Sequence, residues 1–445
     1  MTRRSGARAL DAPHLRALQT TDDAARQQAW KTVERGIAAV VLFVLGYRYN
    51  LPVGLTVGYV AALALLPVWI RIATARRAGV LVYALGVLTA LSGVLLAAYS
   101  SQDHAVSTNS ALISLMLLVG TLAGAGVLLW ARTLMQTGLA VAFFGLGMLL
   151  SISPNSSTFA SNAWKFEIGP AATVLVLGLA SLTGRRWTEA MALILLCATS
   201  ALNDSRSAFA ILMLALLAVV WQARPRAADG RTSAAVTVVA IGAMGYIVYA
   251  FGQALILDGY LGEDTRERSL RQVATSGSIL LGSRPELGAT AGLMAERGMG
   301  YGLGVVPSAG DILAAKAGMA ELGYDPNNGY VERYMFGSRF ELHSVIGDLW
   351  ADFGIMGILY AAVLTGVVVM TSSRLLADGR ASAILVFLVV QSGWNLFFSP
   401  LYSSVPSFIL LLGLLLATAD RPVASLLVAS ASGERRSSRA LGLPG

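Results

Sequence analysis

Four side chains in this sequence could together bind and transfer a phosphorylated group. Three are the arginines Arg206, Arg284 and Arg339, and the fourth is His343, which stands four residues after Arg339. A planar guanidinium group pairs bidentately with phosphate, and an imidazole accepts a proton near neutral pH. These residue types predict a site for an anionic, phosphorylated substrate.

Each arginine also has a simpler interpretation. Arg206, in LNDSRSAF, could pair with Asp204 or extend to the membrane interface. Arg284, in GSRPEL, is by itself typical of a solvated charge, and Arg339 could be an ordinary interface arginine. The residues alone leave these alternatives open.

His343 begins a stripe of mostly small residues if the segment is a helix. His343, Gly347, Trp350, Gly354 and Gly357 would then fall on one face. Such a face allows a second helix or a lipid tail to lie close. The alternative is that the glycines only pack helices together and the histidine lies at the membrane interface.

Several other catalytic signatures are absent from the sequence. It has no DxD pair, no HExxH, no Walker loop and no GxSxG elbow. We therefore expect neither a metal nor a cofactor. Glu189 lies in an apolar segment near its cytoplasmic end and is given no role, and the single cysteine, Cys197, excludes a disulfide framework.

The composition places these residues in a membrane protein. Of 445 residues 56% are hydrophobic and 13% are charged, and the mean hydropathy is +0.65. The net charge of +8 would suit nucleic acid, but the arginines stand singly between apolar runs. The positive-inside rule explains that distribution better, so we expect no nucleic-acid partner.

The hydropathy predicts an all-α protein with about 12 transmembrane helices. The expected spans are 32–50, 51–70, 79–99, 110–131, 134–153, 168–184, 187–203, 206–222, 233–256, 344–370, 381–398 and 405–419. Loops on alternate sides carry the excess of arginine, which predicts that both termini are cytoplasmic.

The spans divide the chain into five parts. Residues 1–31 and 420–445 are expected to be cytoplasmic tails, flanking helices in 32–256 and 344–419. Between them, 257–343 is predicted to be one large, partly helical outer loop, too long for an incidental connection. Within it, GYGLGVVPSAGD and GYDPNNGY are typical of turns.

Three motifs, in this order, resemble the bacterial O-antigen ligase and O-antigen polymerase superfamily. They are SRSAF at 205–209, GSRPELGATAGLMAERGMGYGLG at 282–304 and HSVIGDLWADFGIMG at 343–357, and the similarity extends over roughly 160–420. The third is similar to the family's HN-L-E-G-x-x-G signature. This chain departs from it with Ser344 for the usual Asn, Gly347 for Leu and Asp352 for Glu.

The resemblance implies a metal-independent glycosyltransferase with a class-C-like membrane fold in the bacterial inner membrane, active on the periplasmic face. The donor would be a glycan on undecaprenyl diphosphate. His343 would be the catalytic base for the acceptor hydroxyl, and Arg206 and Arg284 would hold the diphosphate, with Arg339 a secondary candidate by proximity.

The acceptor separates two functions within this family. A polymerase extends one lipid-linked glycan with another, whereas a ligase transfers it to lipid A core. The HS…W…G form resembles exopolysaccharide-associated members and slightly favours a polymerase.

A secondary transporter is the alternative from another class, but transporters commonly show internal repeats and charges at the bilayer midplane, and neither is evident in this sequence. A non-catalytic membrane scaffold is a further alternative.

Overall fold

The computed structural model describes residues 12–223, 233–259, 262–282, 284–325 and 327–417. It is 79% helical, and no strand occurs within these described ranges. Five helical segments are long and apolar enough to cross a membrane, and four shorter apolar helices accompany them. The expectation of an all-α membrane protein is confirmed at this level.

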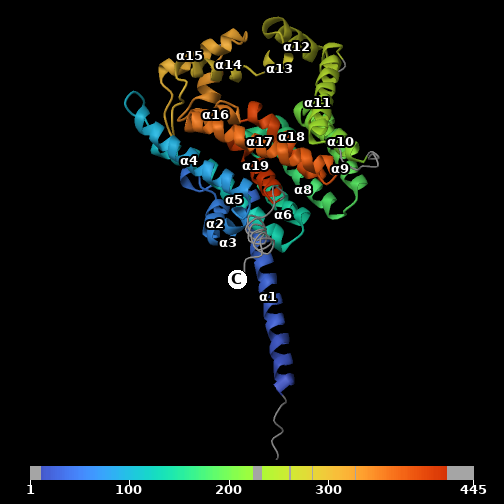
Figure 1. The fold of residues 1–445 in the computed structure, drawn as a ribbon. Coiled ribbons are helices and arrows are strands. Elements are labelled where there is room, and N and C mark those ends of the chain that lie inside the picture. Colours follow the sequence, from blue (N-terminus) through green and yellow to red (C-terminus); the bar gives the residue numbers. More distant parts are fainter. Residues whose placement is uncertain (1–11, 224–232, 260–261, 283, 326, 418–445) are drawn as a thin grey trace, which may run out of the picture.

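The chain begins with α1 (Ala12–Tyr47), which extends well beyond the helix bundle (Figure 1). The expected cytoplasmic tail 1–31 is therefore helical from Ala12 onward, and 1–11 lie outside the described residues.

The expected span 51–70 is wrong as one helix: it is divided into η1 (Pro52–Gly54), α2 (Val57–Ala64) and α3 (Leu66–Ala73). Pro67 lacks an N–H and its ring clashes with the preceding turn, so the helix restarts there.

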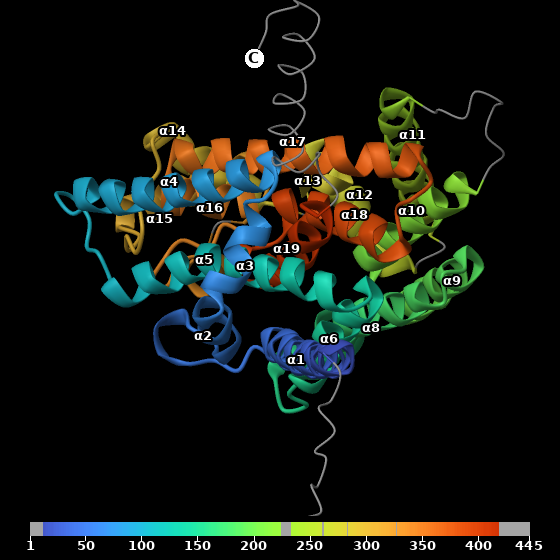
Figure 2. The ribbon, with the colours of Figure 1, turned by 60° about the horizontal axis from the view of Figure 1, so that its bottom comes forward.

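The apolar helices of the bundle follow in chain order. They are α4 (Arg77–Ser100), α5 (Thr108–Leu134), α6 (Thr137–Leu150), α7 (Ser157–Ala163), η2 (Trp164–Ile168), α8 (Gly169–Leu182), α9 (Arg186–Leu202), α10 (Arg206–Gln222) and α11 (Ala234–Leu257). After the large loop come α16 (Val345–Phe353), α17 (Ile355–Ala377), α18 (Ala383–Phe398) and α19 (Leu401–Leu415). Figure 2 shows α4 beside α16 and α17, where Ser92 Oγ donates to the carbonyl of Phe353 at 3.1 Å.

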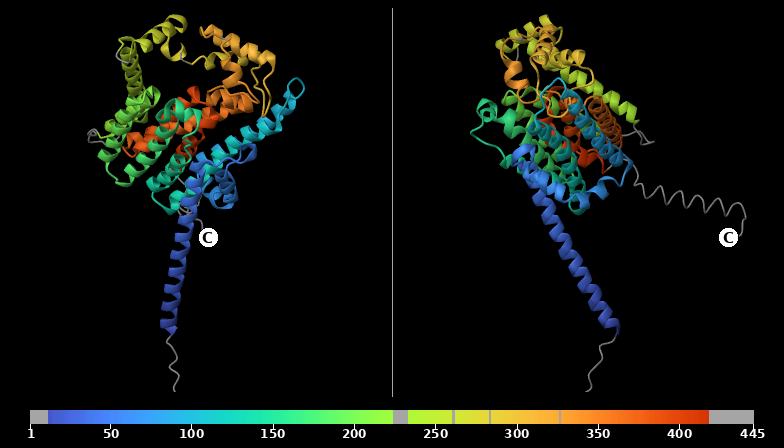
Figure 3. Two further views of the ribbon diagram at one scale, coloured as in Figure 1. Left: turned by 180° about the vertical axis from the view of Figure 1, so that it is seen from behind. Right: turned by 90° about the vertical axis from the view of Figure 1, so that its left-hand side faces the viewer.

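Short helices form a cap over one end of the bundle. The cap consists of α12 (Glu263–Ser276), α13 (Ile279–Gly282), α14 (Glu286–Glu296), α15 (Ala309–Glu321) and η3 (Val331–Met335). A second apolar cluster, which includes Leu293, Met319 and Trp350, packs the cap against α16. Both views in Figure 3 place this cap and the start of α1 at opposite ends of the molecule. We call the capped end the outer end and the other the inner end.

The expected span 344–370 is also wrong as a single helix, because it is broken at Gly354. Gly354 has φ 67° and ψ −150°, a conformation that only glycine adopts readily. A Cβ at this position would lie 2.5 Å from the carbonyl oxygen of Met299. The stripe expected from His343 to Gly357 therefore does not lie on one helix: His343 precedes α16 and Gly357 belongs to α17.

Candidate active site

His343 lies in the short segment that connects the cap to α16. Its φ is 52°, in the left-handed region that a non-glycine residue seldom adopts. The next residue, Ser344, caps α16 by accepting from the N–H of Gly347 at 3.2 Å, and its hydroxyl donates to the carbonyl of Leu396 at 2.9 Å. The chain at His343 is thus held beside the outer end of α18 with local backbone strain.

The buried side chain of Asp348 holds the backbone on both sides of this position. One oxygen of Asp348 accepts from the N–H of Leu342 at 2.7 Å, and the other accepts from the N–H of Leu401 at 2.7 Å. The residue before His343 is therefore tied to the start of α19. This arrangement fixes the backbone immediately before His343.

Two buried polar atoms near His343 lack partners. Nδ1 of His343 and Oε2 of Glu286 are both buried, and neither has a hydrogen-bond partner among the described residues. Tyr330 lies between them: its ring centroid is 6.2 Å from that of His343, and its hydroxyl donates to Oε1 of Glu286 at 2.5 Å. Because unpaired buried polar atoms are costly, they indicate where a ligand could bind.

Tyr330 is held in its neutral form. Burial raises its pKa, and the adjacent Glu286 carboxylate raises it further. The phenol therefore keeps its proton and acts as a donor to Glu286. Glu286 itself is only 8% exposed.

Arg284 lies near the same group of side chains. Its guanidinium carbon is 5.5 Å from the ring centroid of Trp394 and 5.8 Å from that of Phe398, both on α18. Its charge lowers the pKa of Tyr330, which opposes the effects of burial and of Glu286. No carboxylate in the described ranges forms an ion pair with Arg284. The structure thus brings Arg284 and His343 together around Tyr330 and the end of α18.

The other two expected arginines have local partners. Arg339 forms an ion pair with Glu341, with one nitrogen–oxygen distance of 3.0 Å. Because α16 begins only at Val345, Arg339 is not one helical turn before His343. Arg206 begins α10 and is 3.0 Å from a carboxylate oxygen of Asp204. It lies at the outer end of the bundle, because Ala218 in the same helix packs against the inner half of α18.

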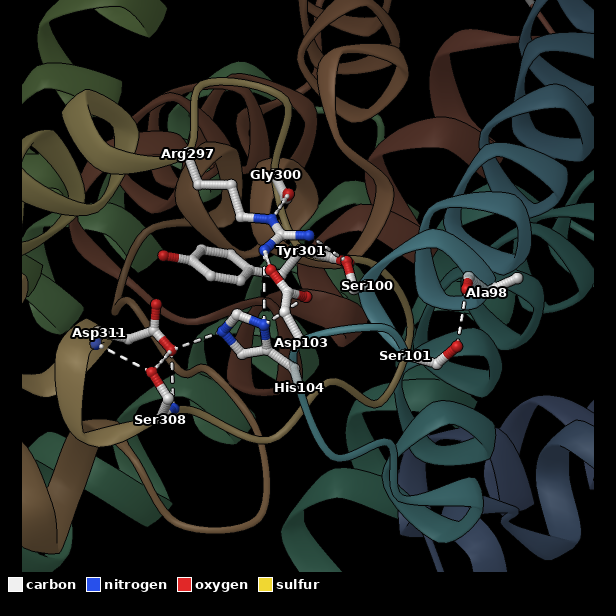
Figure 4. A network of polar contacts seen from close by, with 10 residues as sticks. All are labelled: Ala98, Ser100, Ser101, Asp103, His104, Arg297, Gly300, Tyr301, Ser308 and Asp311. Carbon is white, nitrogen blue, oxygen red and sulfur yellow. Dashed lines mark hydrogen bonds and ion pairs between the residues drawn. The ribbon is translucent and has the colours of Figure 1, made fainter.

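The structure contains a second histidine site, which no sequence pattern predicted (Figure 4). His104, between α4 and α5, places Nδ1 2.9 Å from Asp103 and Nε2 3.0 Å from Asp311. Arg297 completes the network at 2.7 Å from Asp103, and also donates to Ser100 Oγ at 2.8 Å. The adjacent Asp103–His104 pair in an outer loop was the only local signal, because Asp311 is 207 residues away.

The network joins the α4–α5 loop to the cap. Ser308 donates both its N–H and its hydroxyl to Asp311 at 2.7 Å. Two hydrogen bonds lower the pKa of Asp103 to about 2: the one from His104 has the larger effect, and the one from Arg297 adds to it. Burial raises the pKa of Asp311, but its hydrogen bonds, led by those from Ser308, together outweigh burial, and the net pKa is lowered. Both carboxylates are therefore ionised at neutral pH.

Glu189 has a structural position at the inner end. Its carboxylate is 3.3 Å from Arg186 and accepts from the N–H of Ala383 at 3.2 Å, at the start of α18. Arg186 also donates to the carbonyl of Gly379 at 2.7 Å. This pair fixes the α17–α18 connection and lies at the opposite end from His343.

No protein-family model, curated protein or solved structure matches this chain.

Proposed function

We propose that this protein is a membrane glycosyltransferase of cell-surface polysaccharide synthesis. It would transfer a glycan from undecaprenyl diphosphate to a sugar hydroxyl at the outer face, and we favour polymerisation of the glycan. The observation that carries the proposal is that Arg284 and His343 both lie near the end of α18, where Nδ1 of His343 is buried and has no partner among the described residues.

Arg284 suits the diphosphate of the donor. The rings of Trp394 and Phe398 position the guanidinium group without neutralising its charge, so it stays able to pair with an anion. As the glycosidic bond breaks, negative charge increases on the diphosphate. A fixed guanidinium group stabilises that charge without a metal ion.

His343 suits the role of general base. In the proposed step, Nδ1 takes the proton of the acceptor hydroxyl while the hydroxyl oxygen forms a bond to the anomeric carbon. The bond from that carbon to the diphosphate oxygen breaks, and its electron pair leaves with the diphosphate. Arg206 and Arg339 are secondary diphosphate ligands in this proposal, and each would exchange its carboxylate partner for phosphate.

Exposed aromatic side chains near the site fit a lipid-linked substrate. Tyr334, Phe397 and Tyr402 are 56%, 49% and 44% exposed. Aromatic rings of this kind are enriched where a membrane meets water. They would border the path by which the donor lipid reaches Arg284.

The proposal includes the twelve-span topology in a bacterial inner membrane, with both termini cytoplasmic and the cap periplasmic. A phosphatase fused after Lys316 should be active, and one fused to the C-terminal tail should be inactive. The opposite pattern would overturn the orientation.

Incubation of purified protein in nanodiscs with a radiolabelled undecaprenyl diphosphate oligosaccharide tests the activity. Longer lipid-linked chains and released undecaprenyl diphosphate are the expected products. Product only after addition of lipid A core would identify a ligase instead. Movement of intact donor across the membrane without covalent product would identify a transporter and contradict the proposal.

A further inference from the structure

A pocket of about 680 Å³ lies at the inner end of the bundle, far from His343. It is formed by α1, the α5–α6 connection and the end of α8, with Arg35, Arg132, Gln136, Leu139 and Leu182 in its wall. The start of α5 pairs with the cap through Val106 and Val305, and the pocket lies at the other end of α5. At 1.5 Å per residue, the 27 residues of α5 put the pocket about 40 Å from the cap.

Two guanidinium groups give the pocket its charge. Nε of Arg35 donates to the carbonyl of Leu134 at 2.7 Å, which holds the side chain over the pocket. Arg132 donates to Thr137 Oγ1 at 3.1 Å and to the carbonyl of Gly413 at 2.7 Å. None of the described lining residues is an Asp or a Glu, so the positive charge is not balanced within the wall.

The backbone adds further donors. Helix α6 begins in the pocket wall, and its N-cap residue Gln136 forms no side-chain cap. The first N–H groups of a helix have no partner within the helix and favour an anion. The arginines and this helix start therefore converge on one pocket.

We propose that the pocket binds the phosphate of an anionic headgroup at the inner membrane surface. Leu139 and Leu182 are 38% and 37% exposed beside the arginines. They place an apolar surface next to the charge, which suits the acyl chains of a phospholipid better than a free phosphate. Basic pockets between helices on the cytoplasmic side commonly bind such headgroups. This site is independent of the proposed glycan transfer.

Native mass spectrometry of the full chain, transferred from mixed nanodiscs, tests the proposal. We expect the protein to retain phosphatidylglycerol in preference to phosphatidylcholine, and Arg35→Gln to lower that retention about tenfold, since it removes a charge-assisted contact. Arg35→Lys should restore part of it. Arg185→Gln, an exposed arginine at the same end that does not line the pocket, should retain the lipid as the parent does.

A second variant adds repulsion instead of removing a hydrogen bond. Leu139→Glu places a carboxylate in the wall of the pocket at an exposed position, and it should also displace the lipid. Equal retention of phosphatidylglycerol by the parent, Arg35→Gln and Leu139→Glu would overturn the proposal. Binding of soluble glycerol phosphate with the same dependence on Arg35 would support the phosphate site and identify a soluble source.

Discussion

The two histidines at the outer end differ in how completely their polar atoms are bonded. His104 has a carboxylate within 3.0 Å of each ring nitrogen, and Arg297 and Ser308 bind the same carboxylates. His343 has a strained backbone and a buried Nδ1 without a partner in the described structure. Both lie beside the cap, so location alone does not distinguish them.

This difference separates a structural role from a chemical one. An imidazole between two carboxylates holds its surroundings together, and both of its ring nitrogens are already bonded. An imidazole with an unbonded nitrogen can accept a proton from a substrate. The contrast predicts that changes at His104 alter stability, whereas changes at His343 alter the reaction.

The largest expected effect is from removing the imidazole of His343. His343→Asn should lower glycan transfer by about 10²–10⁴-fold, the usual contribution of a general base. Asparagine tolerates positive φ, so the backbone is preserved. His343→Gly should lose as much activity while relieving the strain. Initial rates in nanodiscs measure the loss, with His104→Asn as the matched control. If His343→Asn transfers at the parental rate and His104→Asn does not, the assignment is reversed.

Arg284 should be next in effect. Arg284→Lys and Arg284→Ala should both lower the transfer rate by roughly 10²–10³-fold, as for loss of one transition-state donor. Lysine cannot reproduce the bidentate guanidinium geometry or its position over the rings of Trp394 and Phe398. Rates at saturating donor measure the effect. Arg206→Lys extends the test to the second arginine, and full activity there would reduce Arg206 to a positioning charge.

Arg297→Ala should weaken the fold and not the reaction. It removes the guanidinium group that donates to Asp103 and to Ser100 Oγ, which weakens the link between the cap and the α4–α5 loop. Denaturant unfolding of detergent-solubilised protein measures the change, and the rate per folded molecule should stay at the parental value. Arg333→Ala, in the same cap, is the control. A normal stability with a large loss of rate would place Arg297 in the active site.

The network should also give a modest dependence on acid pH. Asp103 has a pKa of about 2 in the fold against 3.8 for the unperturbed group, so it binds fewer protons folded than unfolded. Such a lowered pKa stabilises the fold above about pH 4, and this contribution is lost as the pH falls towards 2. Melting temperatures between pH 6 and 2 should show a smaller decline for Asp103→Asn than for the parent. An identical decline in both would contradict the ion pairing.

Chelation should have no measurable effect. We expect EDTA to leave glycan transfer unchanged, because Arg284 stabilises the leaving group in the proposed mechanism. If EDTA abolished turnover and Mg²⁺ or Mn²⁺ restored it, the role of the arginine would be wrong.

The fold class and one turn could be predicted from the sequence. Apolar runs with scattered arginines predicted a helical membrane protein, and the glycine-rich segment from Gly300 to Ser308 lies outside the helices, as expected of a turn. The break at Gly354 was missed because hydropathy is continuous across it, whereas the break results from the close approach of the Met299 carbonyl.

The candidate site was predictable only in part. Arg284 and His343 both lie near Tyr330 and the end of α18, and their roles in a site stay predictions. Glu286 and Tyr330 had no sequence signal, because they are 44 residues apart in the chain and only the fold brings them together. The network of His104 was missed for the same reason. Tertiary pairing over such separations cannot be inferred from local spacing.

The separation of His104 from its partners also has a consequence for biosynthesis. Asp311 follows His104 by 207 residues, and a ribosome adds about 5–20 residues per second. Roughly 10–40 s therefore pass between the synthesis of the α4–α5 loop and the synthesis of the cap residues that pair with it. During that interval several further helices must be inserted, so a nascent chain released before the cap is complete would present Asp103 and His104 uncovered to quality-control proteases.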